Sequence, residues 1–242
     1  VYVLGEEEHM RGGNVYGAPG GAFDEATSMF SMAETLLRRE GMTFRNVVRT
    51  WIYLRDMDRD YADLNRARRV FFKSRGLALR PASTGIQGSP FPGEHNFSMG
   101  FLAVKSPSPL EVEVMSTPTL NEAWTYGSDF SRGLKVTEGN KTALYISGTA
   151  SVDEEGRTVH DGDLEAQVDR MLHNISTLLL EQGASFGDLV SGITYLKRAA
   201  DASRLRKIFR DRGLDALPNA MVKAGVCRPD LLCEMEAIAV LP

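Results

Sequence analysis

Apolar residues recur along this chain at two spacings, one typical of helices and the other of strands. From Val168 to Leu179 the apolar side chains fall on one helical face, which predicts a helix over 164–182. Asp163 is placed to cap the N-terminus of this helix, and Gly183 follows its end as a C-terminal glycine does. Similar patterns predict further helices over 23–40, 61–74 and 200–212.

Short β-prone runs separate these helices. They predict strands over 47–54, 97–104, 143–147, 189–196, 219–226 and 231–240. We expect the last two strands to form an antiparallel pair, joined by a turn at Arg228-Pro229-Asp230. The segment before Ala22 is weakly patterned. Its glycine pairs, Gly12-Gly13 and Gly20-Gly21, lack the Lys-Ser/Thr of a phosphate-binding loop and indicate turns.

The chain contains an internal repeat. Segments 36–54 and 179–196 are similar, and Gly41, Phe44 and Tyr53 have counterparts in the second segment at one constant offset. A period near half the chain indicates two copies of one domain rather than a solenoid of short units.

Each copy has the element order β-β-α-β-α-β-β, which predicts an α+β fold with two tandem domains. A sheet covered by helices on one face must bury its other face, so we expect the halves, or separate chains, to pack sheet against sheet. We expect a degenerate N-terminal domain at 1–110, a linker at 111–127 and a C-terminal domain at 128–242.

Composition narrows the possible functions. The chain has 242 residues, of which 43% are hydrophobic and 25% charged, as in ordinary globular proteins. Its net charge of -4 disfavours a general nucleic-acid binder, which needs a basic face. A local basic run between Arg66 and Arg75 lies on a predicted helix, and we interpret it as a solvated outer face.

Targeting signals and cysteine usage bear on the compartment. No apolar run is long enough to span a membrane and no signal peptide is visible, so we expect no membrane partner. Cys227 and Cys233 lie in one predicted strand, too far apart for a disulfide, and free thiols indicate a cytoplasmic protein. Because the chain starts at Val1, we expect it to be a fragment of a longer precursor or to have lost its N-terminus.

The acidic end of the second copy is the strongest candidate for chemistry. Glu234 and Glu236 share one face of a predicted strand, where burial and mutual repulsion raise the pKa of at least one carboxyl. Such a group can act as a general acid, or both can be ion-paired at an interface. Cys227 precedes Arg228, so its thiol is either activated by the cation or an uncharged part of a pocket wall.

Other candidates are weaker. Ser147, Gly148 and Thr149 end a predicted strand, where backbone amides can bind an anion and where a tight turn also explains the glycine. The four histidines are scattered through the sequence and none stands at metal-ligand spacing, so we expect no metal and no cofactor.

Several short motifs resemble the RidA/YjgF superfamily. They are Ile146-Ser147-Gly148, Gly183-x-x-Phe186-x-Asp188-Leu189-Val190 and Glu234-Met235-Glu236-Ala237-Ile238-Ala239. The second half is similar from about 128 to 242, and the first half more loosely from about 22 to 104. The resemblance implies a chorismate-mutase-like fold, a homo-oligomer that is commonly a trimer, and ligand sites in clefts between domains.

The best-known activity of that superfamily is hydrolysis of enamines and imines. For this activity the resemblance implies an arginine that clamps the substrate carboxylate. At that position this chain has Ala220 in the second half and Ser83 in the first. Neither side chain can capture a carboxylate as a guanidinium does. The superfamily's cysteine position is Val222 in one half and Gly85 in the other. The sequence therefore disfavours an enamine or imine deaminase.

A second resemblance is to the chorismatases, tandem members of the superfamily that cleave pyruvate from chorismate. Val48-Arg49-Thr50-Trp51-Ile52-Tyr53, Ile146 to Ser151 and Cys227 to Glu234 are similar to chorismatase segments. The resemblance implies that Glu234 is the catalytic acid and that Cys227 steers the product. Further substrate-binding residues that it implies are Arg228, Ser147, Gly148, Thr149, Phe130, Arg49 and Tyr53. The segment 126–133 departs from the chorismatase pattern.

The sequence-based hypothesis is therefore a cofactor-independent enzyme, a hydrolase or lyase, acting on a small carboxylate metabolite. Glu234 is its general acid, and Arg228 or an arginine of the first half anchors the carboxylate. Two rivals are a non-catalytic metabolite-binding or regulatory protein and a ribonuclease, which the acidic balance disfavours.

Overall fold

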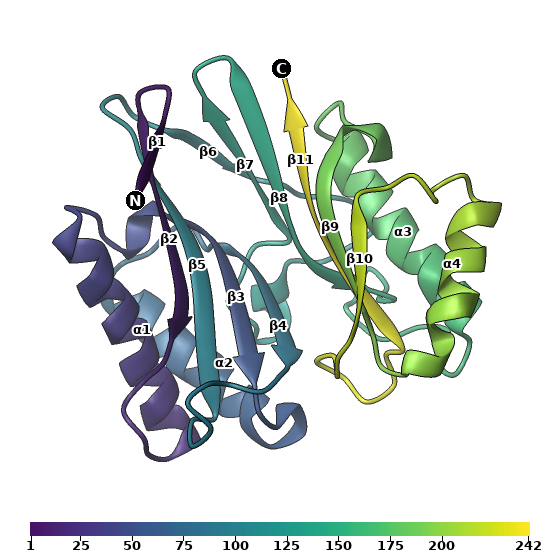
Figure 1. Cartoon of the computed structure of the whole chain (residues 1–242), viewed down its shortest axis with the longest axis horizontal. Coiled ribbons are helices and arrows are strands. Elements are labelled where there is room, and N and C mark those ends of the chain that lie inside the picture. The colour runs from purple at the N-terminus through teal and green to yellow at the C-terminus, as the bar shows by residue number, and fades with distance from the viewer.

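Two β-sheets face each other in the computed structural model of the chain, with the helices on their outer sides (Figure 1). The structure describes residues 1–242, apart from the side chain of Tyr126. α1 and α2 cover the sheet of the first half, whereas α3 and α4 cover the sheet of the second half. This arrangement confirms the expected α+β fold of two tandem units.

The first half supplies a five-stranded sheet of order β1-β2-β5-β3-β4. Its elements are β1 (Tyr2–Leu4), β2 (Glu7–Val15), α1 (Ala22–Arg39), η1 (Phe44–Asn46), β3 (Val47–Leu54), α2 (Met57–Ser74), β4 (Ala82–Gln87) and β5 (Phe97–Lys105), η1 being a 3₁₀ helix. Both predicted helices are present, but α2 begins one turn earlier than expected because Asp56 caps it by accepting a hydrogen bond from Arg59 N at 3.1 Å. Gly12 and Gly13 were wrongly assigned to a turn and lie in β2.

The second half supplies a six-stranded sheet of order β10-β9-β11-β8-β7-β6. Asp163 caps α3 as predicted, and Gly183 follows it with a φ of 71°, a conformation that favours glycine. The elements are β6 (Glu111–Val114), η2 (Ala123–Tyr126), β7 (Gly133–Glu138), β8 (Lys141–Ala150), α3 (Leu164–Leu180), η3 (Phe186–Asp188), β9 (Leu189–Leu196), η4 (Ala199–Asp201), α4 (Ala202–Asp211), β10 (Asn219–Lys223) and β11 (Cys233–Leu241).

The predicted antiparallel pairing of the last two strands is wrong. β10 pairs in parallel with β9, and β11 lies between β9 and β8. The helix α4 between β9 and β10 provides the crossover that a parallel pair requires. Cys227 consequently lies in the loop before β11 rather than in one strand with Cys233, and both thiols are free.

The strand registers identify which residues correspond in the two halves. In the first half Tyr53 faces Ser98 across the β3–β5 pair, and in the second half its counterpart Tyr195 faces Glu234 across the β9–β11 pair. Two residues further along the strand, Gly100 corresponds to Glu236. The second half therefore carries two carboxyl groups on its central strand where the first half carries neither.

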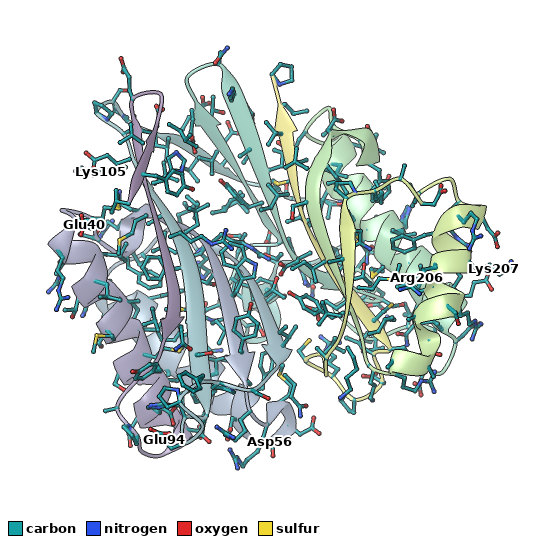
Figure 2. All side chains as sticks on the ribbon, viewed as in Figure 1. Glu40, Asp56, Glu94, Lys105, Arg206 and Lys207 are labelled. Carbon is teal, nitrogen blue, oxygen red and sulfur yellow. The ribbon has the colours of Figure 1, made fainter. Side chains whose placement is uncertain are left out.

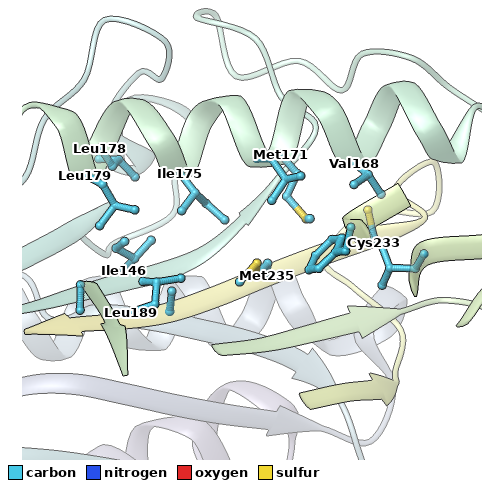
Figure 3. Packing of buried hydrophobic residues seen from close by; sticks show 14 of the residues in the cluster. Ile146, Val168, Met171, Ile175, Leu178, Leu179, Leu189, Cys233 and Met235 are labelled. Carbon is cyan, nitrogen blue, oxygen red and sulfur yellow. The ribbon is translucent and has the colours of Figure 1, made fainter. Parts of the chain in front are cut away.

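Each half has its own hydrophobic core between helices and sheet. In the second half the apolar face of α3 packs on β8 and β11, with Met171 and Ile175 above Met235 (Figure 3). In the first half the core contains four phenylalanines of α1, η1 and α2, with the rings of Phe30 and Phe71 5.5 Å apart. These cores fix the helices on the outer faces.

The inner faces of the two sheets bury a third apolar cluster. Val48, Ala82 and Leu102 from the first half pack against Leu134 and Tyr145 from the second half. This packing confirms the expected sheet-on-sheet contact between halves.

Strand β4 also joins the halves through hydrogen bonds. Ser83 N donates to Ser147 Oγ at 2.8 Å, and Gln87 N donates to Gly225 O at 2.8 Å. The proposed linker 111–127 contains β6, which pairs with β7, so part of this segment belongs to the second sheet. The boundaries at 110 and 128 stay a prediction.

Charged side chains lie around the outside of the molecule, as Glu94, Arg206 and Lys207 illustrate (Figure 2). Among the described residues, no helix combines the length and apolar character needed to cross a membrane.

We predict that Phe30→Ala lowers the free energy of unfolding by about 3 to 5 kcal/mol, because the side chain is fully buried and its loss leaves a cavity. Met32→Ala in the same helix is the matched control, since Met32 is 48% exposed and we expect a change below about 1 kcal/mol. Urea unfolding measures both. Equal losses in the two variants would contradict the described core.

Candidate functional site

A cavity of about 650 Å³ lies between the two halves. α2 and β4 of the first half form one wall, and β8, β11 and the loop before β11 form the opposite wall. Its lining includes Tyr61, Asn65, Arg68, Ser83, Gly85, Phe130, Arg132, Gly148, Cys227, Arg228 and Glu234. Because both walls are needed, neither half alone contains the site.

Glu234 is the acidic side chain of this lining. It is only 4% exposed, because β11 is the third strand of its sheet and the first half covers its inner face. Burial, and next the nearby charge of Glu236, raise the pKa of Glu234 from 4.5 to about 8. Arg49, Arg132 and Arg228 oppose this rise. Glu234 therefore holds its proton at neutral pH and can donate it to a ligand.

Behind Glu234, a buried ion pair joins the halves. Arg49 Nη2 on β3 donates to Glu236 Oε2 at 2.8 Å, and Trp51 Nε1 donates to Glu236 Oε1 at 2.8 Å. Arg49 Nη2 also donates to the hydroxyl of Thr84 on β4, which accepts from Gly148 N at 3.0 Å. Glu236 is thus ion-paired, in agreement with the structural alternative that the sequence left open for it.

Gly148 makes room for the acid. A Cβ atom at this position would lie 2.0 Å from Glu234 Oε1 and 3.1 Å from the Thr84 methyl group. Any larger residue would have to displace the carboxyl group, so the absence of a side chain at 148 determines where Glu234 can sit.

Cys227 lies beside the acid. Its Sγ is 4.0 Å from Glu234 Oε2, and burial, followed by the charge of Glu234, raises the pKa of the thiol to about 12. The thiol is therefore uncharged, as one of the two interpretations of the sequence had it, and forms part of the cavity wall.

Five arginines line the cavity. Arg68 and Arg132 lie on Phe130, with guanidinium carbons 5.5 and 5.8 Å from its ring centroid. Arg68 Nη1 also donates to Ser83 Oγ at 3.3 Å, and Arg228 Nη1 donates to Thr158 Oγ1 at 3.3 Å. Arg66 and Arg69 are ion-paired with Asp63 and Asp129 at 3.0 and 3.1 Å. With a protonated Glu234, the charges of Arg68, Arg132 and Arg228 make the lining electropositive, which favours an anionic ligand.

The interpretation of the basic run on α2 as a solvated face was wrong for one residue. Arg66 and Arg69 are partly exposed at the cavity, but Arg68 is only 4% exposed. Arg68 follows Leu64 by four positions, so it lies on the buried face of α2. That spacing is the signal by which the sequence could have identified it. Arg132 lies just before β7, and no pattern in the sequence indicated that it would line the cavity.

The cavity brings together only some of the residues predicted for substrate binding. Cys227, Arg228, Gly148 and Phe130 line it with Glu234. Arg49 and Tyr53 instead line a second cavity on the far side of the Arg49–Glu236 pair.

Ser147 and Thr149 are buried in β8, where their side chains bind other groups of the protein. Ser147 Oγ donates to Ser131 O at 2.6 Å, and Thr149 Oγ1 donates to Ser147 O at 2.9 Å. The amides of Ser147 and Gly148 donate to Arg132 O and Thr84 Oγ1, both at 3.0 Å. These amides are not available to an anion, because the segment continues a strand instead of ending one.

Within the part of the chain that the structure describes, no three His, Cys, Asp or Glu side chains are grouped to hold a metal ion. The groups that line the cavity offer proton donation by Glu234 and anion binding by the arginines.

The family described as Endoribonuclease L-PSP matches residues 128–241. A RutC family protein of Pyrococcus abyssi is 34% identical over 112 residues, which are 46% of this chain and 84% of that protein.

Other relatives match nearly the whole chain. A 3-hydroxybenzoate synthase of Streptomyces hygroscopicus is 28% identical over 91% of this chain and 71% of its own length. A chorismatase of Streptomyces rapamycinicus is 26% identical over 88% of this chain and 67% of its own length. A crystal structure of a chorismatase has the same fold, with a TM-score of 0.76 and 23% identity over 96% of this chain and 74% of that one.

The raised pKa of Glu234 predicts a pH-dependent stability. The folded protein keeps this proton up to about pH 8, whereas the unfolded carboxyl loses it near 4.5, so stability is lost as pH rises through this range. Glu234→Gln has no such loss. At about pH 9 we expect its free energy of unfolding to exceed that of the parent by on the order of 4 kcal/mol, and near pH 4.5 by almost nothing.

Urea unfolding at the two pH values measures this difference. Glu181→Gln is the control, because Glu181 is exposed and we expect equal stability to the parent at both pH values. A difference between Glu234→Gln and the parent that does not change with pH would contradict a buried, protonated Glu234.

Proposed function

The chain belongs to the RidA/YjgF superfamily, and from this premise we propose that it is a chorismatase-like enzyme that releases pyruvate from a small cyclic carboxylate. The observation that carries the proposal is the buried Glu234 with its raised pKa, in a cavity lined by five arginines. The relatives named chorismatase and 3-hydroxybenzoate synthase, which match nearly the whole chain, support the same reaction class.

The chemistry follows from the positions of the groups. An arginine of the lining, Arg228, Arg132 or Arg68, binds the substrate carboxylate. Glu234 donates its proton to the methylene carbon of the enol ether that joins the pyruvyl group to the ring. Water adds to the enol carbon, and the bond from this carbon to the ether oxygen breaks. One proton of the water goes to the departing alcohol oxygen, and the other returns to Glu234. One water is consumed, and an alcohol and pyruvate are formed.

Cys227 and Phe130 contribute to substrate orientation in this proposal. Cys227 lies against Glu234 as an uncharged group, and Phe130 lies next to the guanidinium groups of Arg68 and Arg132. Both side chains form apolar wall beside the polar groups and favour a flat, partly apolar ring.

The deaminase alternative has less support. Ser83 lines the cavity, but its hydroxyl already binds Arg68 and Thr50, and Ala220 lies on the edge strand β10. Arginines do reach the cavity from other elements, so carboxylate binding does not require those two positions. A homo-oligomer, most simply a trimer, and a cytoplasmic location stay predictions.

We expect the purified protein to release pyruvate from chorismate and Glu234→Gln to lose this activity by about a hundredfold or more, because the proton donor is removed. A lactate dehydrogenase assay measures the pyruvate. Glu181→Gln serves as the control and should keep the parental rate. Calorimetric titration should show that Glu234→Gln still binds chorismate.

Three outcomes would count against this proposal. Absence of pyruvate from the parent protein would exclude chorismate as substrate, and chorismate binding without turnover would favour the regulatory alternative. Undiminished turnover by Glu234→Gln would exclude this residue as the acid.

The pH profile tests how Glu236 affects the acid. Turnover requires the protonated acid, so kcat/KM should fall above about pH 8. Glu236→Gln removes the neighbouring negative charge and leaves Arg49 without its ion-pair partner, and both changes lower the pKa of Glu234. We expect the fall to begin about one pH unit lower. Circular dichroism checks that the variant is folded, and an unshifted profile would exclude this effect of Glu236.

A further inference from the structure

A second cavity, of about 540 Å³, opens between the inner faces of the two sheets on the other side of the Arg49–Glu236 pair. We call it the Trp51 cavity. Its polar and aromatic lining includes Arg11, Arg49, Trp51, Tyr53, Tyr145 and Glu236. The two cavities have no lining residue in common, so a ligand can occupy either one independently.

Arg49 is a buried cation with unused hydrogen-bonding capacity in this cavity. Its side chain is 1% exposed, and its Nη2 group binds Glu236 and Thr84. Its Nε and Nη1 groups have no hydrogen-bond partner. Buried donors are nearly always paired, so these two groups can donate hydrogen bonds to acceptor oxygens that enter from outside the chain.

The charge balance of the lining favours an anion. Each oxygen of Glu236 already accepts one hydrogen bond, from Trp51 Nε1 and from Arg49 Nη2. Arg11, on β2 at the exposed edge of the cavity, adds a second cation. The lining thus has two guanidinium groups, of Arg11 and Arg49, and one carboxylate, of Glu236, which is already hydrogen-bonded. The cavity therefore has an excess of positive charge.

An aromatic surface stands beside these cations. Trp51 has the guanidinium carbons of Arg49 and Arg11 at 5.2 and 5.5 Å from its ring centroid. Tyr145, Leu102 and Ile238 line the cavity with it. Such a wall packs against a flat ring and adds little affinity for a small inorganic anion.

Gly100, in the first half, leaves space in the cavity for the flat ring of a ligand. Gly100 lies at the position where the second half has Glu236, and a Cβ atom there would meet the Trp51 side chain at 3.7 Å without a clash. A larger side chain at 100 would therefore fill the floor of the cavity next to Trp51.

From these contacts we propose that the Trp51 cavity is a second binding site, for a small aromatic carboxylate. The carboxylate accepts hydrogen bonds from Arg49 and Arg11, and the ring packs against Trp51 and Tyr145. This site is independent of catalysis by Glu234, and its occupation does not depend on the proposed reaction.

Benzoate is the probe for this site, and Trp51 is the reporter. The chain has two tryptophans, so Trp124→Phe leaves Trp51 as the sole source of tryptophan fluorescence. In this background we expect benzoate to change the fluorescence saturably. Benzyl alcohol, which has the ring without the charge, should bind about tenfold or more weakly, since a charge-assisted hydrogen bond is lost.

Variants locate the bound probe. Arg11→Met and Gly100→Val should each weaken benzoate binding about tenfold or more, because the first removes a cation and the second fills the floor. Neither change touches the Arg49–Glu236 pair, whose loss would endanger folding. Glu234→Gln and Arg69→Met alter the first cavity and should leave the affinity of benzoate unchanged.

Three results would overturn the proposal. These are the lack of a saturable signal with millimolar benzoate, equal binding of benzyl alcohol, and parental affinity in both Arg11→Met and Gly100→Val. Weakening by Glu234→Gln or Arg69→Met instead would assign the probe to the first cavity. Failure of pyruvate release from chorismate leaves these outcomes unaffected, so the two proposals can fail separately.

Discussion

The contact between Arg49 and Glu236 determines how the two halves of this molecule fit together. The two groups lie 2.8 Å apart across the sheet-to-sheet interface, with side chains 1% and 8% exposed. Neither charge could be buried without the other, because an isolated ion loses its hydration and gains nothing in return. The pair therefore requires the halves to stay in one relative position. It also places a negative charge close to Glu234, where it adds to the effect of burial on the proton affinity of that carboxyl.

The candidate site depends on this fixed arrangement at the level of single atoms. Thr84 accepts hydrogen bonds from Arg49 and from Gly148 N, and so connects the ion pair to the strand beside the acid. Gly148 leaves the space that the Glu234 carboxyl occupies. The acid is thus positioned by the backbone of its own half and covered by the other half. A buried, protonated carboxyl next to arginines is a proton donor in an anion-binding cavity, and this combination connects the fold to the proposed reaction.

Much of the fold could be predicted from the sequence, because the repeat and the helical stripes are local signals. Asp163 and Gly183 mark the ends of α3 in the sequence as they do in the structure. The position of β11 between β8 and β9 could not be predicted, since strand order is set by the whole sheet and not by neighbouring residues. In the site, Glu234 was identifiable from the strand that follows the turn at 228–230, and Cys227 from its place directly before that turn. Thr84 and Arg132 were not, because only the packing of the two halves brings Thr84 to Gly148 and closes the cavity that Arg132 lines.

The asymmetry between Ser98 and Glu234 has an evolutionary consequence. In a ring of identical single-domain subunits, every cleft between neighbours is formed by the same two surfaces. A substitution in one of these surfaces therefore changes every cleft of the ring. A fused pair is released from this constraint, because each copy mutates alone. One copy of this chain has carboxyl groups on its central strand, while the other has Ser98 and Gly100 at the same positions. A tandem chain can therefore line each of its cavities with two different faces, and the two cavities of this molecule share no residue.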